Sequence, residues 1–135
     1  MVSVWIREGN NILFYVKKIV LEKPNFTIIN EYSNGDAAIK KMLLQIIIEE
    51  FPVEKEKYTT SFHNRDFIKT KEVVHKLKNK IRVLGLTHGC KIAVDYEKQL
   101  IDENTALHHE FEKILDSISE FVVHIKNTIL KNVYP

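Results

Sequence analysis

His75 is the residue of this 135-residue chain whose surroundings best fit a chemical role. A neutral imidazole nitrogen is a nucleophile and can hold a phosphoryl group covalently. At i−4, i+3, i+4 and i+7 from His75 stand three cations and one amide: Lys71, Lys78, Asn79 and Arg82. Cations offset the charge of phosphoryl oxygens during transfer, and Lys78, one turn beyond His75, is the best placed of them. The spacing therefore predicts an exposed histidine in a basic patch.

The helix that must position His75 is predicted over residues 67–84, with Asp66 as its N-cap and Gly85 as its stop. At about 100° per residue, its apolar side chains fall on one arc, which we expect to face the core. They are Val73, Val74, Leu77, Ile81 and Leu84. His75 lies on the other side of this helix, and Ile68, two turns earlier, points outward beside it. An exposed isoleucine next to an exposed histidine predicts a docking contact.

Helical periodicity continues on both sides of this segment. Asp36 can cap a helix that Pro52 should kink or interrupt, and residues 53–62 could continue that helix beyond a bend. Two further helices are expected over about 89–101 and 105–130. Four helical segments with short connections predict an all-α fold, an antiparallel up-down four-helix bundle with a short N-terminal extension.

The N-terminal extension covers residues 1–24 and precedes the bundle domain, which we place at residues 25–134. Alternating apolar residues on either side of a turn-like cluster at 8–11 would fit a β-hairpin. Residues 12–21 also fit one face of a helix, so hairpin and helix both remain open here.

Composition and charge are those of an ordinary globular protein, with 44% hydrophobic and 28% charged residues. The apolar stretch over 12–21 contains two lysines and is too short to span a bilayer, and no signal-peptide cleavage pattern is visible. We therefore expect a cytoplasmic protein without membrane insertion, and the single cysteine fits a reducing compartment. The net charge of +2 is small, the basic residues look dispersed, and no nucleic-acid motif is present, so no nucleic-acid partner is expected.

Residues 74–86 resemble the signature of the histidine-containing phosphotransfer (HPt) domain of bacterial two-component phosphorelays. That signature reads His-x-Leu-Lys, a small or turn-prone residue, four variable positions, an apolar residue and glycine. The matching residues are His75, Leu77, Lys78, Leu84 and Gly85. Residues 49–52 are similar to the acidic-apolar-Pro bend of the preceding helix in this family, and residues 65–67 to the loop that begins the histidine helix.

The resemblance implies that His75 accepts a phosphoryl group from the aspartate of a receiver domain and passes it to another receiver domain. It further implies that Lys78 steadies the phosphoryl group and that Gly85 is structural. The implied docking residues are Ile68, Lys71, Asn79 and Arg82. Such a domain is a monomeric carrier, not an enzyme, and has no cofactor of its own, because the receiver domain supplies Mg²⁺ and the acidic pocket.

Two positions depart from the family pattern, and both lie on the implied docking surface. Asn79 stands where glycine is most common, and Arg82 is bulkier than the small residues often found there. Asparagine is small, so we expect docking to survive at position 79, and both positions should bear on which receiver domain docks.

Two other functions compete with the carrier function. A helical interaction adaptor without covalent chemistry would make His75 dispensable. A di-metal bundle would use Glu-x-x-His motifs on two helices. Glu72 and His75 form one such motif, but the sequence has no second one and both side chains are expected to point outward.

Overall fold

The computed structural model describes residues 22–133, and this part of the chain consists of helices and their connections, without a strand. The helices are α2 (Thr27–Ser33), α3 (Ala37–His63), α4 (Phe67–Val83), α5 (Thr87–Ile101) and α6 (His108–Val133). The predicted all-α class is thereby confirmed. The hairpin or helix predicted within the first 21 residues lies outside the described residues.

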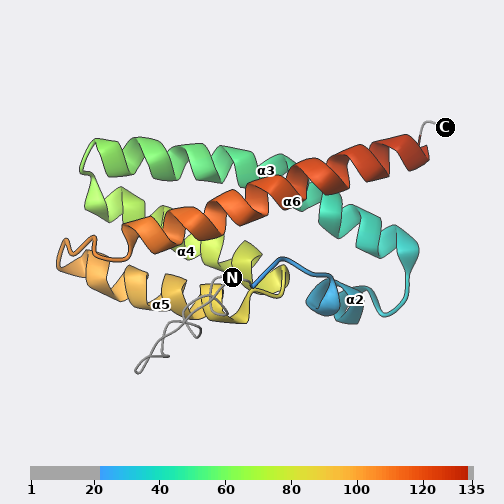
Figure 1. The fold of residues 1–135 in the computed structure, drawn as a ribbon, viewed down its shortest axis with the longest axis horizontal. Coiled ribbons are helices and arrows are strands. Elements are labelled where there is room, and N and C mark those ends of the chain that lie inside the picture. The colour runs from blue at the N-terminus through green and yellow to red at the C-terminus, as the bar shows by residue number, and fades with distance from the viewer. Residues whose placement is uncertain (1–21, 134–135) are drawn as a thin grey trace, which may run out of the picture.

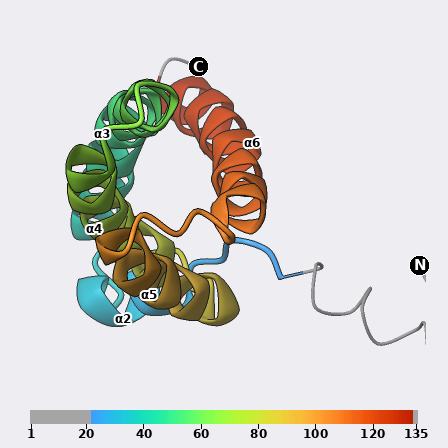
Figure 2. The same cartoon turned by 90° about the vertical axis from the view of Figure 1, so that its left-hand side faces the viewer.

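The four long helices lie side by side and alternate in direction along the chain (Figure 1). Seen along its length, the molecule has α3, α4, α5 and α6 arranged around a common centre, with α6 back beside α3 (Figure 2). Contacts join α3 to α4, α4 to α5, α5 to α6 and α3 to α6. Helix α4 therefore has α3 on one side and α5 on the other, and α6 lies across the core from it.

The core forms where the apolar faces of these helices meet. All five side chains that the periodicity assigns to the core, four in α4 and Leu84 just after it, are buried, and none is more than 3% exposed. They pack in one cluster with large aromatic side chains from the other helices, namely Phe51, Tyr58, Tyr96 and Phe111. Burial of these side chains is the main source of stability and fixes which side of α4 faces solvent.

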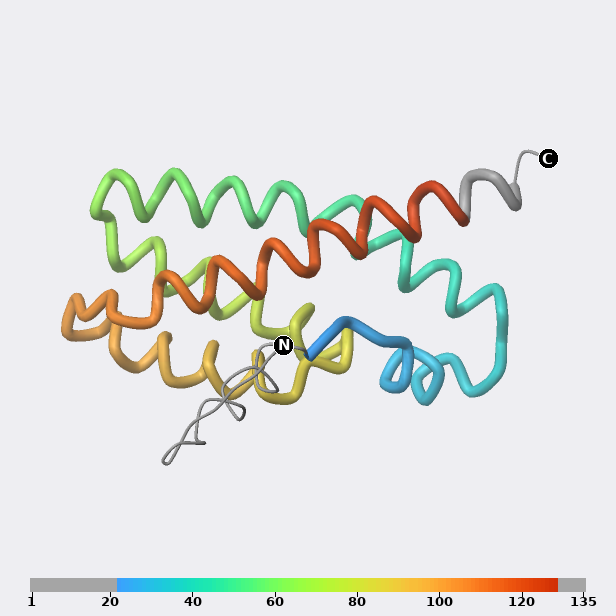
Figure 3. The backbone as a smooth tube through the Cα atoms, in the orientation of Figure 1, coloured from blue at the N-terminus to red at the C-terminus, as the bar shows by residue number. Residues whose placement is uncertain are grey.

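Pro52 was predicted either to kink or to interrupt the helix that contains it. It does not interrupt it, because α3 continues through Pro52. Figure 3 shows α3 bent, with its first turns running at an angle to the rest. A bend is how a helix accommodates a proline, which lacks an N–H and crowds the preceding turn. The predicted cap is confirmed, because the Asp36 carboxylate accepts hydrogen bonds from the N–H groups of Ala38 and Ile39 at 2.9 and 3.1 Å.

Both predicted ends of α4 are confirmed. The Asp66 carboxylate accepts a hydrogen bond from the N–H of Lys69 at 3.1 Å and caps the first turn. Gly85 follows the last turn in the left-handed conformation, with φ +79°, which a residue with a side chain adopts only at a cost. A Cβ at this position would also overlap the Asn25 side chain. Glycine is therefore favoured here first by its backbone conformation, and a larger residue would also have to displace the Asn25 side chain.

Helix α2 was not predicted from the sequence. The chain before it is tied to the α4–α5 connection, because the N–H of Asn25 donates to the carbonyl of Leu84 at 2.8 Å. The Glu22 carboxylate accepts from the N–H groups of His88 and Gly89 at the start of α5, both at 2.9 Å. Within residues 22–133, no helix combines the length and apolar character needed to cross a membrane.

Candidate functional site

His75 lies in the middle of α4 on the side that faces away from the core. Its side chain is 59% exposed. The neighbouring Val74 and Leu77 are fully buried, so packing of their side chains orients the helix and turns His75 outward. The predicted exposure of His75 is confirmed.

A carboxylate from α5 completes the surroundings of His75, and the sequence interpretation missed it. The Oε2 atom of Glu97 lies 2.7 Å from Nδ1 of His75, and Lys78 donates from Nζ to Oε1 of Glu97 at 2.9 Å. Glu97 thus bridges His75 and Lys78, both of which belong to the matching residues of the signature. The expectation that only cations and one amide surround the imidazole was wrong, because α5 packs beside α4 at this level.

The protonation of Glu97 decides which nitrogen of His75 is available. Burial alone would raise the pKa of Glu97, but the hydrogen bonds from Lys78 and His75 outweigh it and lower that pKa. The carboxylate is therefore ionised at neutral pH and can only accept hydrogen bonds. Nδ1 of His75 must then carry the hydrogen, which leaves the lone pair of the neutral ring on Nε2. Among the described residues, none is hydrogen-bonded to Nε2, so this nucleophilic nitrogen is open to a partner.

The four predicted docking residues lie along the outward side of α4. Ile68 is 78% exposed, Asn79 and Arg82 are exposed, and Lys71 is half-buried. Within the described part of the chain, none of the four is hydrogen-bonded to His75. The guanidinium of Arg82 instead donates to the hydroxyl of Tyr32 on α2 at 3.0 Å.

Positive charge is concentrated on α4. This helix holds six of the 20 Lys and Arg residues and one of the 18 Asp and Glu residues, which leaves 14 cations against 17 carboxylates in the rest of the chain. The view that basic residues are dispersed along the chain was wrong. Lys69, Lys78 and Lys80 are paired with glutamates. Of the other cations on α4, Lys71, Lys76 and Arg82 form no ion pair with any residue in 22–133.

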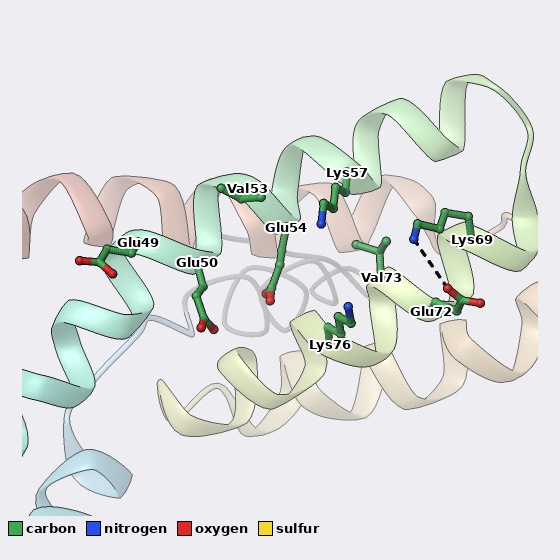
Figure 4. Close-up of a pocket in the computed structure, with 9 residues that line it drawn as sticks. All are labelled: Glu49, Glu50, Val53, Glu54, Lys57, Lys69, Glu72, Val73 and Lys76. Carbon is green, nitrogen blue, oxygen red and sulfur yellow. Dashed lines mark ion pairs between the residues drawn. The ribbon is translucent and has the colours of Figure 1, made fainter.

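A shallow groove separates α4 from α3 on the side away from His75. Its lining is mixed in charge: Glu49, Glu50, Val53, Glu54, Lys57, Lys69, Glu72, Val73 and Lys76 (Figure 4). Glu72 pairs with Lys69 at 3.8 Å in this groove, whereas His75 is turned toward α5. The two members of the Glu-x-x-His motif thus face different neighbours. No group of three His, Cys, Asp or Glu side chains within residues 22–133 is arranged to hold a metal ion.

A second histidine, His108 at the start of α6, lies in a buried polar network. Its Nδ1 is 2.6 Å from the hydroxyl of Tyr58, which is itself 2.7 Å from the hydroxyl of Tyr96. Its Nε2 is 3.3 Å from Oε1 of Glu112, and its ring stacks on Phe62 with centroids 3.6 Å apart. Burial lowers the pKa of His108, partly opposed by Glu112, and this favours the neutral ring.

Comparison with known proteins identifies no relative with a similar site. No protein-family model matches the chain, and neither a curated protein nor a solved structure matches it.

Proposed function

We propose that this chain is a phosphorelay carrier of the HPt type, which accepts a phosphoryl group on Nε2 of His75 from the aspartate of a receiver domain. It then passes the group to another receiver domain. The observation that carries the proposal is the hydrogen bond between Nδ1 of His75 and Glu97, because it leaves Nε2 of an exposed imidazole as the nucleophile. The four alternating helices fit the up-down bundle of such carriers, with the histidine on the outer side of the second long helix.

The proposed transfer balances without a proton donor or acceptor. The lone pair of Nε2 forms the N–P bond as the bond between phosphorus and the aspartyl oxygen breaks, and the aspartate leaves as a carboxylate. The ring gains one positive charge and keeps its hydrogen on Nδ1. Glu97, which accepts that hydrogen at 2.7 Å, stabilises the charged ring. The reverse steps deliver the group to the next aspartate.

Lys78 has two roles in this proposal. In the unmodified protein it neutralises Glu97 through a hydrogen bond of 2.9 Å. After transfer it lies one helical turn from the phosphoryl oxygens and can share its three N–H donors between them and Glu97. Mg²⁺ and the acidic pocket belong to the receiver domain, so this chain acts as a carrier without a cofactor and without enzymatic turnover of its own.

Charge on the outward side of α4 supports a receiver domain as partner. Lys71 and Arg82 lie one and two turns from His75 on the side of α4 that carries it, and an acidic pocket around a reactive aspartate complements them. Ile68, 78% exposed, supplies an apolar contact on the same face. One such face is enough for docking, so we propose that the carrier acts as a monomer in the cytoplasm.

The test is transfer from a receiver domain that has been phosphorylated with labelled acetyl phosphate. We expect the wild-type chain to take up label that is labile in acid and stable in base. His75→Gln should take up none. His109→Gln, which changes an exposed histidine on α6, is the matched control and should label like the wild type. Equal labelling of His75→Gln and the wild type would contradict the proposal.

A helical adaptor would give a different result in the same assay. It would bind the receiver domain without taking up label, and His75→Gln would bind equally well. The exposed residues of α4 suit either function, and the observation that favours the carrier is that the oriented His75 ring leaves Nε2 exposed.

A further inference from the structure

Helix α2 adds a tyrosine to the face of α4 that carries His75. Tyr32, in the last turn of α2, accepts a hydrogen bond from Nη1 of Arg82 at 3.0 Å. Its side chain is 53% exposed although α2 itself is fixed, because Ile29 is fully buried and Ser33 is 2% exposed. The tyrosine is therefore held in place by a helix anchored in the core, and its ring remains open to solvent.

Tyr32 and Ile68 lie at opposite ends of one surface. Ile68 precedes His75 by seven residues and Arg82 follows it by seven, so both lie two turns away on the same side of α4. The distance from Ile68 to Arg82 is about 21 Å along the helix. His75 thus lies midway between an exposed isoleucine and an exposed tyrosine–arginine pair, with Lys71 between Ile68 and His75 on the same side of the helix.

We propose that Tyr32 is a docking residue for the receiver domain and that its hydroxyl positions Arg82 for acidic groups of that partner. The proposal rests on the proposed function of His75. Tyrosine and arginine contribute more than most residues to binding energy at protein interfaces. An arginine that is already held in one orientation loses less conformational freedom on binding, and its guanidinium can bind a carboxylate through two hydrogen bonds. The partner is the acidic face of a receiver domain, because α4 carries six cations and one carboxylate.

The experiment measures the rate of phosphoryl transfer to His75 against the concentration of phosphorylated receiver domain. Tyr32→Ala should raise the half-saturating concentration about tenfold. Tyr32→Phe, which removes only the hydroxyl, should raise it about threefold. Neither should change the rate at saturation, because Tyr32 contacts Arg82, which lies about two helical turns beyond His75 on α4. In an Arg82→Ala background, Tyr32→Phe should have no further effect, because the hydroxyl acts through Arg82.

The control is Val123→Ala, an exposed apolar residue on α6, which lies across the core from α4. It should leave both the half-saturating concentration and the saturated rate unchanged. An unchanged half-saturating concentration in Tyr32→Ala, or a loss confined to the saturated rate, would overturn the inference while labelling of His75 upheld the proposed function. Absence of label on His75 in the wild type would overturn both.

Discussion

The surroundings of His75 and His108 differ in one respect that decides what each ring can do. Both histidines have a hydrogen-bonded Nδ1 and a glutamate within 3.3 Å. His108 has partners at both nitrogens and is stacked on Phe62, whereas His75 is 59% exposed with a partner at Nδ1 only among the described residues. A carboxylate beside a histidine is therefore not the mark of a reactive site. The mark is an oriented ring whose second nitrogen is free.

The sharpest test of this comparison is to remove each ring in turn. His75→Ala should abolish labelling and change the free energy of unfolding by less than about 0.5 kcal/mol, because an exposed side chain is lost. His108→Ala should keep labelling and lose about 2 kcal/mol of stability, because Tyr58 loses its partner and Phe62 its stacked ring. Label uptake and urea unfolding measure the two effects. Loss of labelling in a folded His108→Ala variant would contradict the conclusion that His75 is reactive and His108 is structural.

Removing the two glutamates should give a smaller difference of the same kind. Glu97→Ala should slow labelling of His75 about tenfold, because the ring loses the partner that fixes its hydrogen on Nδ1. Glu112→Ala should leave the rate of labelling unchanged, because its side chain contacts His108 instead. The comparison is made at saturating receiver domain, and a rate for Glu97→Ala equal to that of the wild type would show that Glu97 does not orient the nucleophile.

The smallest expected effect is a dependence of stability on pH. Because burial holds the pKa of folded His108 below its ordinary 6.5, the unfolded chain binds its proton first as the pH falls. The contribution of His108 to stability should thus be constant above pH 6.5 and decrease as the pH falls from 6.5 through the pKa of the folded state. Glu97, whose pKa is lowered from 4.5, adds a separate loss of stability below pH 4.5. Urea unfolding at a series of pH values checks this. His108→Gln should lack the first loss, and an undiminished slope in that variant would contradict the assignment.

The sequence was enough to place α4 and His75, because the information is local. Apolar residues at helical spacing define the buried side, Asp66 begins the helix, and Gly85 ends it. An amphipathic helix that is buried on one side fixes the exposure of every residue on the other. Exposure of His75 and Ile68 therefore followed from the pattern alone.

Glu97 and α2 could not be placed in the same way. Glu97 meets His75 only because α5 packs beside α4, and periodicity within one helix does not give the rotation of its neighbour. One signal in the sequence pointed to Glu97: it is next to the core residue Tyr96 on α5, the helix that follows α4. Helix α2 is seven residues long, too short for a clear period, and its N-cap, Phe26, has no side chain that could mark the start of a helix.

The most direct test of the central claim is ¹⁵N and ³¹P NMR of the histidine-labelled protein after transfer from a phosphorylated receiver domain. We predict one phosphorylated histidine, His75, with phosphorus bonded to Nε2 and hydrogen retained on Nδ1. A phosphoryl group on Nδ1 of His75, on another residue, or on none would contradict the claim that Glu97 holds one nitrogen so that the other can carry phosphate.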